Sequence, residues 1–423
     1  MTPLTRLATV VMAAGLLLPR PAYPQDVTIE QLVAMAMKQA PALQVARAEN
    51  GVAAGRVGQA GLKANPMLAT THEHEPGGMA VTAGGIEWPL ELFRRQARVA
   101  AAERTAESVS LAVRDRERLL AAVVRQEAGR LLAARRTFEV TNEALTAARR
   151  MRDLLDRRVT EGGTPKIDAN LAAVEAMRIE AEVALAAGEV EAATIELKAL
   201  VGLPASAPLV LSDSLERLVA SPMVPRFTTV TAMEARPDIR EALARISAAG
   251  AGAERARQDG RLDLSLIAGY SRNRLTFPQL GLDEHHGLVP IQNSFTTVTI
   301  GARATLPFRN RNQGAIAAAQ AEREGAEALF SARQLSARAE IDAAVARERE
   351  ARRAVELYAT SIRQLAQQNV DVMLEGYDLG RFLLSDVLSE QRRYLDVEAG
   401  YTTVLARAYD ARVAVSRAFG EIP

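Results

Sequence analysis

Histidine and carboxylate side chains occur together at two places in the sequence, in a combination that could bind a metal ion. His72 and His74 stand in a His-Glu-His-Glu run, and His285 and His286 follow an Asp-Glu pair. Imidazole and carboxylate groups suit Zn²⁺, Ni²⁺ or Co²⁺. Both pairs fall in segments that we expect to be solvated hairpins, where these residues need no metal. The sequence therefore predicts no resident metal and no other cofactor.

The sequence contains no recognisable catalytic constellation. The motifs HExxH, GxSxG and GxxxxGK[ST] are absent. There is no Cys, which excludes disulfides, thiolate catalysis and Cys-based zinc sites. The nearby Gly55, Gly58 and Gly61 do not form a GxGxxG dinucleotide motif. We therefore predict that the protein is not an enzyme.

Two glycine–aspartate pairs recur at the same spacing. Asp168 stands six residues after Gly162, and Asp386 stands six residues after Gly380. Each pair marks a glycine turn followed by the first turn of a helix. An Asp at that position is favourable because it interacts with the positive end of the helix dipole.

Composition indicates long helices rather than several compact domains. The chain has 423 residues, 52 basic and 51 acidic side chains, and only 4% aromatic residues. Near-neutral charge argues against a nucleic-acid partner, which needs many Lys and Arg contacts. Few aromatic residues combined with abundant Ala, Arg, Glu and Leu are typical of helices packed through small side chains. The predicted fold is mainly α with a small β part.

Residues 1–22 read as an export signal. A basic Arg6 precedes an apolar stretch over residues 7–18, and Ala22 is a plausible cleavage residue. The apolar stretch is shorter than the ~20 residues that a transmembrane helix needs. No later segment is long and apolar enough to be a membrane-spanning helix.

The remaining chain contains two copies of one repeat. Pro89 and Pro307 precede long helical stretches and lie 218 residues apart, as do the two glycine–aspartate pairs. Upstream, Pro41 and Pro237 lie 196 residues apart, so the second copy contains an insertion of about 22 residues. We place this insertion, as a loop, at Thr276–Ser294. The predicted organisation is a first repeat at 27–203, a linker at 204–226 and a second repeat at 227–420.

Each repeat is expected to contain a helix, two strands and two long helices. The first helices are predicted at Ile29 to about Lys63 and at Ala235 to about Arg257. Leu92–Thr160 has no Pro and one Gly, so a continuous helix there would span ~100 Å. Apolar residues recur at sevenfold spacing, which predicts coiled-coil packing. Examples are Val124, Leu131, Phe138 and Leu145, and, near the C-terminus, Tyr394, Tyr401, Ala408 and Val415.

An arginine-rich stretch within the first long helix is predicted to be a solvated face. Its members are Arg114, Arg116, Arg118 and Arg125. Charged side chains on a helix are mostly exposed. We therefore assign this stretch no partner.

Apolar and polar residues alternate in the two predicted strands of the second repeat, over residues 262–271 and 297–306. Runs of ~10 residues match tilted strands that cross a bilayer. In the first repeat the alternation from Met79 changes phase at Gly84-Gly85, which predicts a bulge. Trp88, the only Trp, lies at a strand end. It is expected at a membrane interface, with ordinary packing as the alternative.

Four strands per chain cannot close a barrel, and unpaired backbone groups in lipid each cost several kcal/mol. Neighbouring copies must therefore share the barrel. Two copies would supply eight strands and three would supply twelve, and twelve leaves room for a lumen.

At this point the sequence resembles the TolC-type outer-membrane efflux proteins. The export signal, the duplicated strand–strand–helix–helix plan and the paired glycine–aspartate turns are shared. Two stretches, IEWPLEL at 86–92 and LPFRNRNQG at 306–314, are most similar to the CzcC-type branch, which is associated with heavy-metal cation efflux.

The resemblance implies a homotrimer with a 12-strand barrel in the outer membrane and a long antiparallel helical barrel in the periplasm. It implies a periplasmic adaptor and an inner-membrane RND-type pump as partners, with outer-membrane lipid around the barrel. Asp386 and Asp168 would constrict the periplasmic entrance, and the turns at Gly162 and Gly380 would meet the adaptor. A further family acid, one turn after Asp386, is Ser389 here.

Three functions compete at this stage. The first is a passive exit duct for divalent heavy-metal cations. In such a duct, tight metal binding by loop histidines would slow release of the cations. The second is drug efflux or type I secretion through the same architecture. The third is a periplasmic coiled-coil scaffold without a pore, which the ten-residue amphipathic strands disfavour.

Overall fold

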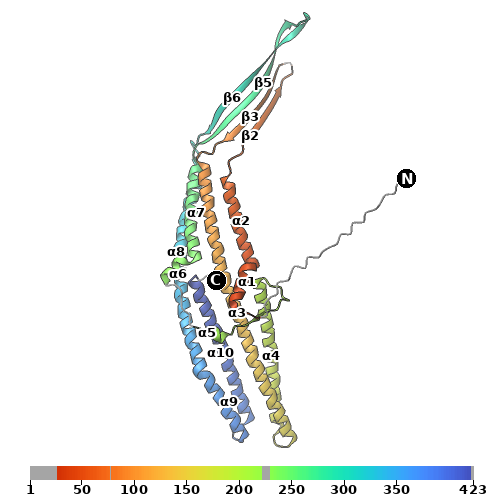
Figure 1. Cartoon of the computed structure of the whole chain (residues 1–423), viewed down its shortest axis with the longest axis vertical. Helices are drawn as coiled ribbons and strands as arrows, with labels where there is room; N and C mark the ends of the chain where they lie inside the picture. The colour runs from red at the N-terminus through yellow and green to blue at the C-terminus, as the bar shows by residue number, and fades with distance from the viewer. Residues whose placement is uncertain (1–25, 77, 222–228, 421–423) are drawn as a thin grey trace, which may run out of the picture.

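The computed structural model describes residues 26–76, 78–221 and 229–420. The export signal predicted for residues 1–22 lies outside these ranges. The molecule is elongated, with a β-sheet at one end, a helical wall in the middle, and the tips of two helical hairpins at the other end (Figure 1). This is the predicted combination of long antiparallel helices with a small sheet.

The helices of the two repeats alternate with the strands in the predicted order. They are α1 (Ile29–Gln39), α2 (Pro41–Gly61), α3 (Arg94–Thr160), α4 (Lys166–Val201), α5 (Leu215–Ala220), α6 (Thr229–Ala235), α7 (Pro237–Asp259), α8 (Gln313–Leu357), α9 (Arg363–Asp378) and α10 (Leu384–Ala418). A π-helical turn, η1 (Tyr358–Ile362), joins α8 directly to α9. The prediction of one helix from Ile29 to about Lys63 is wrong, because Ala40 is not helical and Pro41 starts a new helix.

Two helical runs extend through the whole wall, whereas their neighbours change halfway. Near the sheet, α3 packs against α2 and α7, and α7 packs against α8. Towards the tips, α3 packs against α4 and α10, and α10 packs against α8 and α9. The C-terminus of α4 abuts the start of α2, since a Cβ on Gly202 would lie 2.8 Å from the Gln39 carbonyl oxygen. The uninterrupted helix predicted for Leu92–Thr160 is confirmed by the 67 residues of α3.

The sevenfold apolar spacing identifies much of the helical packing. Val124, Leu131 and Leu145 of α3 are buried, as are Ala408 and Val415 of α10. The one glycine of α3 sits where α10 approaches most closely. A Cβ on Gly129 would lie 2.5 Å from the ring of Tyr409. Glycine is therefore required there by helix contact and not by a turn.

The sheet contains four antiparallel strands in the order β2-β3-β5-β6. Their bounds are β2 (Met67–His74), β3 (Met79–Pro89), β5 (Asp263–Leu282) and β6 (Leu288–Thr305). The predicted bulge at Gly84-Gly85 is wrong, because pairing with Thr70 and Ala69 continues through both glycines without a shift. The loop predicted at Thr276–Ser294 is also wrong. These residues lengthen β5 and β6 to 20 and 18 residues, and the irregular pairing falls between Thr276 and Leu280.

The two hairpins have equivalent registers. Met67 pairs with Glu87 in the first hairpin, and Asp263 pairs with Thr305 in the second. Asp263 lies 196 residues after Met67, and Thr305 lies 218 residues after Glu87. The two sequence offsets therefore describe the sheet pairing, and the extra residues of the second repeat form a hairpin extension that projects beyond β2 and β3 (Figure 1).

The two faces of the sheet differ in polarity. One face carries an apolar belt that we define as Leu264, Leu266, Ala268 and Tyr270 of β5 with Val298, Ile300, Ala302 and Ala304 of β6. The opposite face carries polar residues such as Ser265, Ser271 and Arg303. Alternation of this kind places one face in an apolar medium and the other in water. None of the described helices is long and apolar enough to cross a membrane.

A small subdomain packs against the middle of the helical wall. β1 (Asp26–Val27) pairs in parallel with β4 (Val210–Leu211), and the Asp213 carboxylate accepts a 2.7 Å hydrogen bond from the Ile29 N–H at the start of α1. Within the predicted linker, β4 and the buried Leu215 of α5 join the largest apolar core. The stretch from 204 to 221 is therefore packed structure rather than a simple connection.

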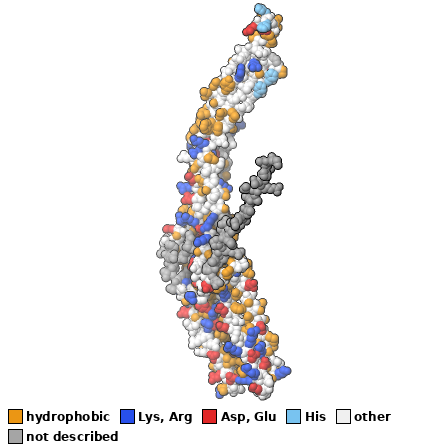
Figure 2. All heavy atoms as spheres, turned by 45° about the vertical axis from the view of Figure 1, so that its right-hand side comes forward, with side chains coloured by type: hydrophobic (Ala, Val, Ile, Leu, Met, Phe, Trp, Pro, Cys, Tyr) orange, Lys and Arg blue, Asp and Glu red, His pale blue; other side chains and the backbone are white. Residues whose placement is uncertain are grey.

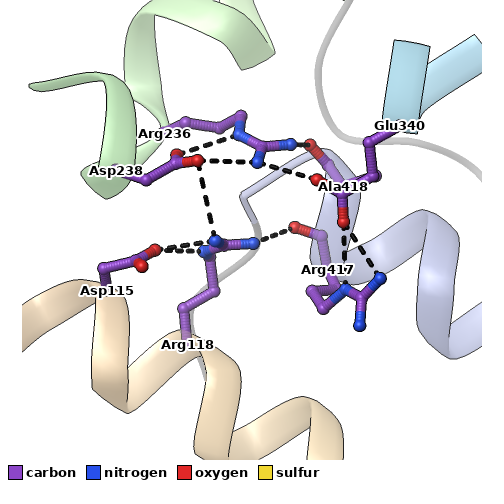
Figure 3. A network of polar contacts seen from close by, with 7 residues as sticks. All are labelled: Asp115, Arg118, Arg236, Asp238, Glu340, Arg417 and Ala418. Carbon is purple, nitrogen blue, oxygen red and sulfur yellow. Dashed lines mark hydrogen bonds and ion pairs between the residues drawn. The ribbon is translucent and has the colours of Figure 1, made fainter. Parts of the chain in front are cut away.

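Figure 3 shows a buried ionic network at the point where α10 ends and α7 begins. Arg236 contacts Asp238 at 2.8 Å and Glu340 at 2.9 Å, and its guanidinium donates to the Ala418 carbonyl at 2.7 Å. Arg118 contacts Asp115 at 2.7 Å and donates to the Arg417 carbonyl at 2.6 Å.

Arg118 is only 3% exposed. Its assignment to a solvated arginine face is therefore wrong, because the C-terminal carbonyls of α10 and two nearby carboxylates need a buried cation.

The corresponding junction of the first repeat is apolar. The positions equivalent to Arg236, Glu340 and Arg417 are occupied by alanines. These are Ala40 at an offset of 196, and Ala122 and Ala199 at an offset of 218. Ala40 and Ala122 belong to the largest apolar core. The duplicated joint is thus held by apolar packing in one repeat and by charge in the other.

The ionic junction makes stability depend on pH. Burial raises the pKa of Asp238, but hydrogen bonds and charge from Arg236 outweigh burial and lower the pKa overall. A depressed pKa in the folded state stabilises the protein above the ordinary Asp value of about 3.9. This stabilisation is lost as pH falls from there through the folded-state pKa. We expect Asp238→Asn to cost about 3 kcal/mol at pH 7, because it leaves buried arginine charge uncompensated.

Thermal unfolding of the detergent-solubilised protein, measured by circular dichroism between pH 7 and pH 3, checks this expectation. The melting temperature of the wild type should exceed that of Asp238→Asn at pH 7, and this difference should shrink as the pH falls towards 3. Asp153→Asn is the control, since the exposed Asp153 pairs with its neighbour Arg152 and its loss should change little. Equal melting temperatures for all three proteins at pH 7 would contradict the expectation.

Candidate functional site

The two helical hairpins end side by side at the pole opposite the sheet (Figure 1). Gly162 and Gly380 have φ of +75° and +69°, the left-handed region in which glycine costs least. The following N–H groups close matching turns, from Gly163 to the Arg158 carbonyl and from Arg381 to the Gly376 carbonyl, each at 2.8 Å. Nothing lies within 4 Å of a Cβ built on either glycine, so both turns present open surface.

Asp168 and Asp386 lie in the first turns of α4 and α10, as predicted. The Asp386 carboxylate accepts a hydrogen bond of 3.3 Å from the Leu383 N–H, so it caps the helix while remaining exposed. Asp168 is half-buried beside Tyr377 of the neighbouring hairpin. Burial raises the pKa of Tyr377, and the negative charge of Asp168 adds to the increase. The predicted constriction by these two residues stays a prediction.

A cross-hairpin ion pair holds the two tips together. Arg158 at the end of α3 contacts Asp378 at the end of α9 at 3.4 Å, and we call this pair the tip clamp. Beneath it, an apolar cluster joins the two hairpins. Its buried members are Leu155, Ala169, Ala172, Leu384 and Leu388. Both partners of the tip clamp are exposed, so the clamp is weak compared with the cluster beneath it.

One level further from the tips, a buried carboxylate joins α4 to α10. Glu175 is 3% exposed and contacts Arg178 and Arg392, each at 2.6 Å. Burial raises the pKa of Glu175, but the two arginines outweigh it and the pKa is lowered. Glu175 is therefore charged at neutral pH. Beside it a groove of 510 Å³ runs between α3, α4 and α10, and its charged lining includes Glu182, Glu189 and Asp396.

A second buried carboxylate lies at the π-helical turn. Glu398 of α10 contacts Arg136 at 3.1 Å and Arg363 at 2.6 Å. The two guanidinium groups also lie over the Tyr401 ring, at 5.0 and 4.5 Å from its centroid. Tyr358, the first residue of η1, stacks on Tyr401 with centroids 6.3 Å apart. The irregular turn is therefore fixed by aromatic and ionic contacts.

The histidines do not come together. His72 and His74 lie on β2, and the His72 Nδ1 contacts the Thr82 hydroxyl at 2.9 Å. His285 and His286 lie in the turn between β5 and β6, where the Asp283 carboxylate accepts a hydrogen bond from the His285 N–H. No group of three or more potential metal ligands forms within the described ranges.

Trp88 lies on the apolar face of the sheet, opposite Leu266, and is 49% exposed. The exposed Leu306 and Phe308 continue the apolar surface beyond the strands, towards the helical wall. The assignment of Trp88 to a membrane interface remains a prediction.

Sequence reasoning missed the ionic contacts between hairpins. Arg158 and Asp378 are 220 residues apart, and Glu175 and Arg392 are 217 apart. Their separations are close to the repeat offset of 218, which brings equivalent levels of the two hairpins together. That offset was the available signal, although charge alone did not distinguish these residues from the many exposed Arg and Glu side chains.

Residues 32–203 and 229–421 match the family described as outer membrane efflux protein. The chain belongs to this family. An outer-membrane efflux protein is thus the established class, and the predicted membrane location and TolC-type resemblance are confirmed.

Similarity extends over nearly the whole chain. The cobalt-zinc-cadmium resistance protein CzcC of Cupriavidus metallidurans is 26% identical over 95% of this chain and 92% of its own. A crystal structure of CusC, which shows conformational changes that accompany folding and transmembrane channel formation, is 18% identical. It aligns with a TM-score of 0.75 over 93% of this chain and 92% of CusC. The outer-membrane channel OprN, also 18% identical, aligns with a TM-score of 0.74 over 93% of this chain and 89% of its own. These structures confirm the predicted fold.

Loss of the tip clamp should favour separation of the hairpin tips. An exposed ion pair contributes about 0.2–1 kcal/mol, so Arg158→Gln should raise the population with separated tips by at most about fivefold. Spin labels placed on the two turns, one at Thr164 and one at Leu379, would report the distance distribution in the purified protein.

Arg152→Gln is the matched control, since Arg152 lies two turns from the tip and pairs within its own helix. An unchanged distance distribution for both Arg158→Gln and Asp378→Asn would show that the clamp does not restrain the tips.

Proposed function

We propose that three copies of this chain form a passive duct that leads out of the periplasm across the outer membrane. The four-stranded sheets would close into a 12-strand barrel, and the helical walls would form a tunnel that ends at the hairpin tips. Such a duct needs conduction and gating and no catalytic group. A drug-efflux or type I secretion duct is the alternative within this architecture, and a scaffold without a pore is the alternative outside it.

The open sheet carries this proposal. Both edge strands, β2 and β6, are exposed along their whole length, while the inner strands β3 and β5 are partly covered. An apolar belt next to unpaired strand edges is not tolerated in lipid, where each unpaired backbone group costs several kcal/mol. Closure by neighbouring copies satisfies every edge, and the polar face then lines a water-filled lumen.

The internal duplication predicts how the edges meet. Gly85 of β3 pairs with Gly269 of β5. Adding the offset of 218 to Gly85 gives Arg303 of β6, and subtracting the offset of 196 from Gly269 gives Glu73 of β2. Arg303 of one copy should therefore lie opposite Glu73 of the next. Because side chains alternate between the two faces along each strand, Arg303 and Glu73 both lie on the polar face. Their charges are complementary. The Leu90 N–H donates to the Leu264 carbonyl, and the Thr276 N–H donates to the Gly78 carbonyl. Hydrogen-bonded and non-hydrogen-bonded pairs alternate along an antiparallel ladder, so the Gly85–Gly269 pair is non-hydrogen-bonded. Side chains are closest at such positions.

A cysteine pair at Glu73 and Arg303 should therefore cross-link neighbouring copies. The chain has no Cys of its own, so no background disulfide exists. We expect Glu73→Cys with Arg303→Cys to yield covalent trimers on a non-reducing gel after mild oxidation in membranes. Glu73→Cys combined with Gly301→Cys or with Thr305→Cys, each two residues out of register, should yield few.

The outcomes separate two kinds of failure. A trimer by mass that cross-links best through Gly301 or Thr305 would contradict the register only. A detergent-extracted monomer without cross-links would contradict the duct itself.

Divalent metal cations are the proposed cargo. CzcC, whose name refers to cobalt, zinc and cadmium resistance, covers 95% of this chain, and the sequence resemblance at 86–92 and 306–314 points to the same branch. The metals are cargo and not resident ions. A periplasmic adaptor at the turns of Gly162 and Gly380, and an RND-type pump beyond it, would complete the pathway. The open surface of the two turns supports this placement.

Deletion of the gene should sensitise cells to these metals. We expect a lower minimal inhibitory concentration of Co²⁺, Zn²⁺ or Cd²⁺, restored by the wild-type gene on a plasmid. Tolerance to hydrophobic drugs and the amount of secreted protein serve as controls. Drug sensitivity with unchanged metal tolerance would favour the alternative cargo.

Asp386, with Asp168 near it, is the proposed selective constriction. Three exposed Asp386 carboxylates around the axis would attract cations and repel anions. Asp386→Asn keeps an oxygen that can accept the hydrogen bond from the Leu383 N–H, so it removes charge while preserving the helix cap.

Reversal potentials in planar bilayers should show the effect of this charge. We expect the cation-to-anion permeability ratio of Asp386→Asn to fall roughly two- to fivefold, corresponding to about 0.5–1 kcal/mol per ion at an exposed ring. Asp153→Asn, which removes an exposed carboxylate paired with Arg152 in α3, is the control. A ratio unchanged in Asp386→Asn would leave helix capping as the role of this residue.

A further inference from the structure

Beyond the apolar belt, basic side chains gather on the same face of the sheet. His72 and His74 of β2 lie in the same rows as Arg272 and Arg274 of β5, because Thr82 pairs with both His72 and Arg272, and Ala80 pairs with both His74 and Arg274. We call these four residues the cationic patch. Figure 2 shows Arg and His side chains together on the upper part of the sheet. Two strand spacings of ~4.8 Å separate the paired members of each row.

The patch begins where the apolar belt ends. On β5, the face-sharing residues Leu264, Leu266, Ala268 and Tyr270 are followed directly by Arg272 and Arg274. Their neighbours on β6 change in the same way, from Val298 to Thr296 and Ser294. An aromatic residue followed by basic residues is the order expected when a surface leaves the hydrocarbon and enters the headgroup region.

The arginines of the patch lack an anionic partner in the described part of the chain. Both Arg272 and Arg274 are exposed, and neither forms an ion pair there. The nearby Glu73 falls on the opposite face by strand alternation. Arg303, the remaining arginine of these strands, also lies on the opposite face and pairs with Glu87. An unpaired guanidinium beside hydrocarbon needs an anion, and a phosphate accepts its two parallel N–H donors.

We propose that the cationic patch binds phosphate groups of lipid headgroups at the outer surface of the membrane. Arg272 and Arg274 supply the charge, and His72, His74 and the Thr82 hydroxyl supply further hydrogen-bonding groups. In a trimer the patch recurs three times around the barrel, so phosphorylated lipids would form a ring around the duct. The inference rests on the proposed function, because it requires the belt to lie in lipid with the β5–β6 turn outside.

Lipid retention by the purified trimer tests the site. The protein is reconstituted in nanodiscs of phosphatidylcholine that contain one-tenth lipid A carrying two phosphates, then released into detergent and examined by native mass spectrometry. We expect the wild type to retain lipid A on most trimers. Arg272→Gln combined with Arg274→Gln should reduce the retained lipid A at least threefold.

Two controls make the result specific. Arg309→Gln changes an exposed arginine past the end of β6, away from the cationic patch, and should retain lipid A like the wild type. Lipid A that lacks both phosphates but has the same acyl chains should be retained poorly by every protein, and free inorganic phosphate at millimolar concentration should not displace the phosphorylated form.

The outcomes are distinguishable. Equal retention by the wild type and the double variant, or equal loss in Arg309→Gln, would overturn the phosphate site while leaving the duct intact. Displacement by inorganic phosphate would show a site for the free ion and not for a lipid. A protein that does not enter nanodiscs as a trimer would instead contradict the proposed function.

Discussion

Backbone hydrogen bonding at the edges of the sheet governs this structure. The four strands pair with each other, with one irregularity in the β5–β6 register between Thr276 and Leu280, yet β2 and β6 leave their outer N–H and C=O groups unpaired within the sheet. In water these groups would find solvent, but the apolar belt on one face requires lipid. The two requirements agree only if neighbouring copies complete the sheet. Everything below the sheet then has to follow the same symmetry, because each helical wall continues directly from its strands.

Charge is used sparingly inside the helical wall, and at places where hairpins meet. Glu175, Glu398 and the network around Arg236 are buried carboxylate–arginine groups that each connect helices from both repeats. Buried ion pairs contribute less stability than apolar packing but are specific for one geometry. The first repeat has its apolar junction embedded in the largest core, whereas the second depends on the ionic one. The duplicated halves therefore share a fold but differ in what holds them.

The sequence predicted much of this fold because repetition and periodicity are strong signals. The long helix ending at Thr160, the glycine turns and the alternating strands of the second repeat could be located from spacing alone. The hairpin extension beyond Thr276 could not, because Pro, Gly and Asn residues there resemble a loop while pairing across the hairpin overrides them. Arg118 was misassigned for a related reason. Its burial depends on carbonyl groups about 300 residues away in the chain, and no local pattern reports them.

The stagger of helix ends has a mechanical consequence. The α4–α2 and α10–α7 ends meet halfway along the wall, and beside each meeting point runs α3 or the α8–α9 helix without a chain break. Bending the wall at its middle would therefore require an intact helix to bend as well, because an uninterrupted helix runs past each joint. Rigidity along the length leaves twisting and sideways sliding of neighbouring helices as the soft deformations. A push along the wall at the tips would then be carried over ~100 Å towards the strands, whereas a rotation imposed there would be taken up by twisting and sliding of the helices.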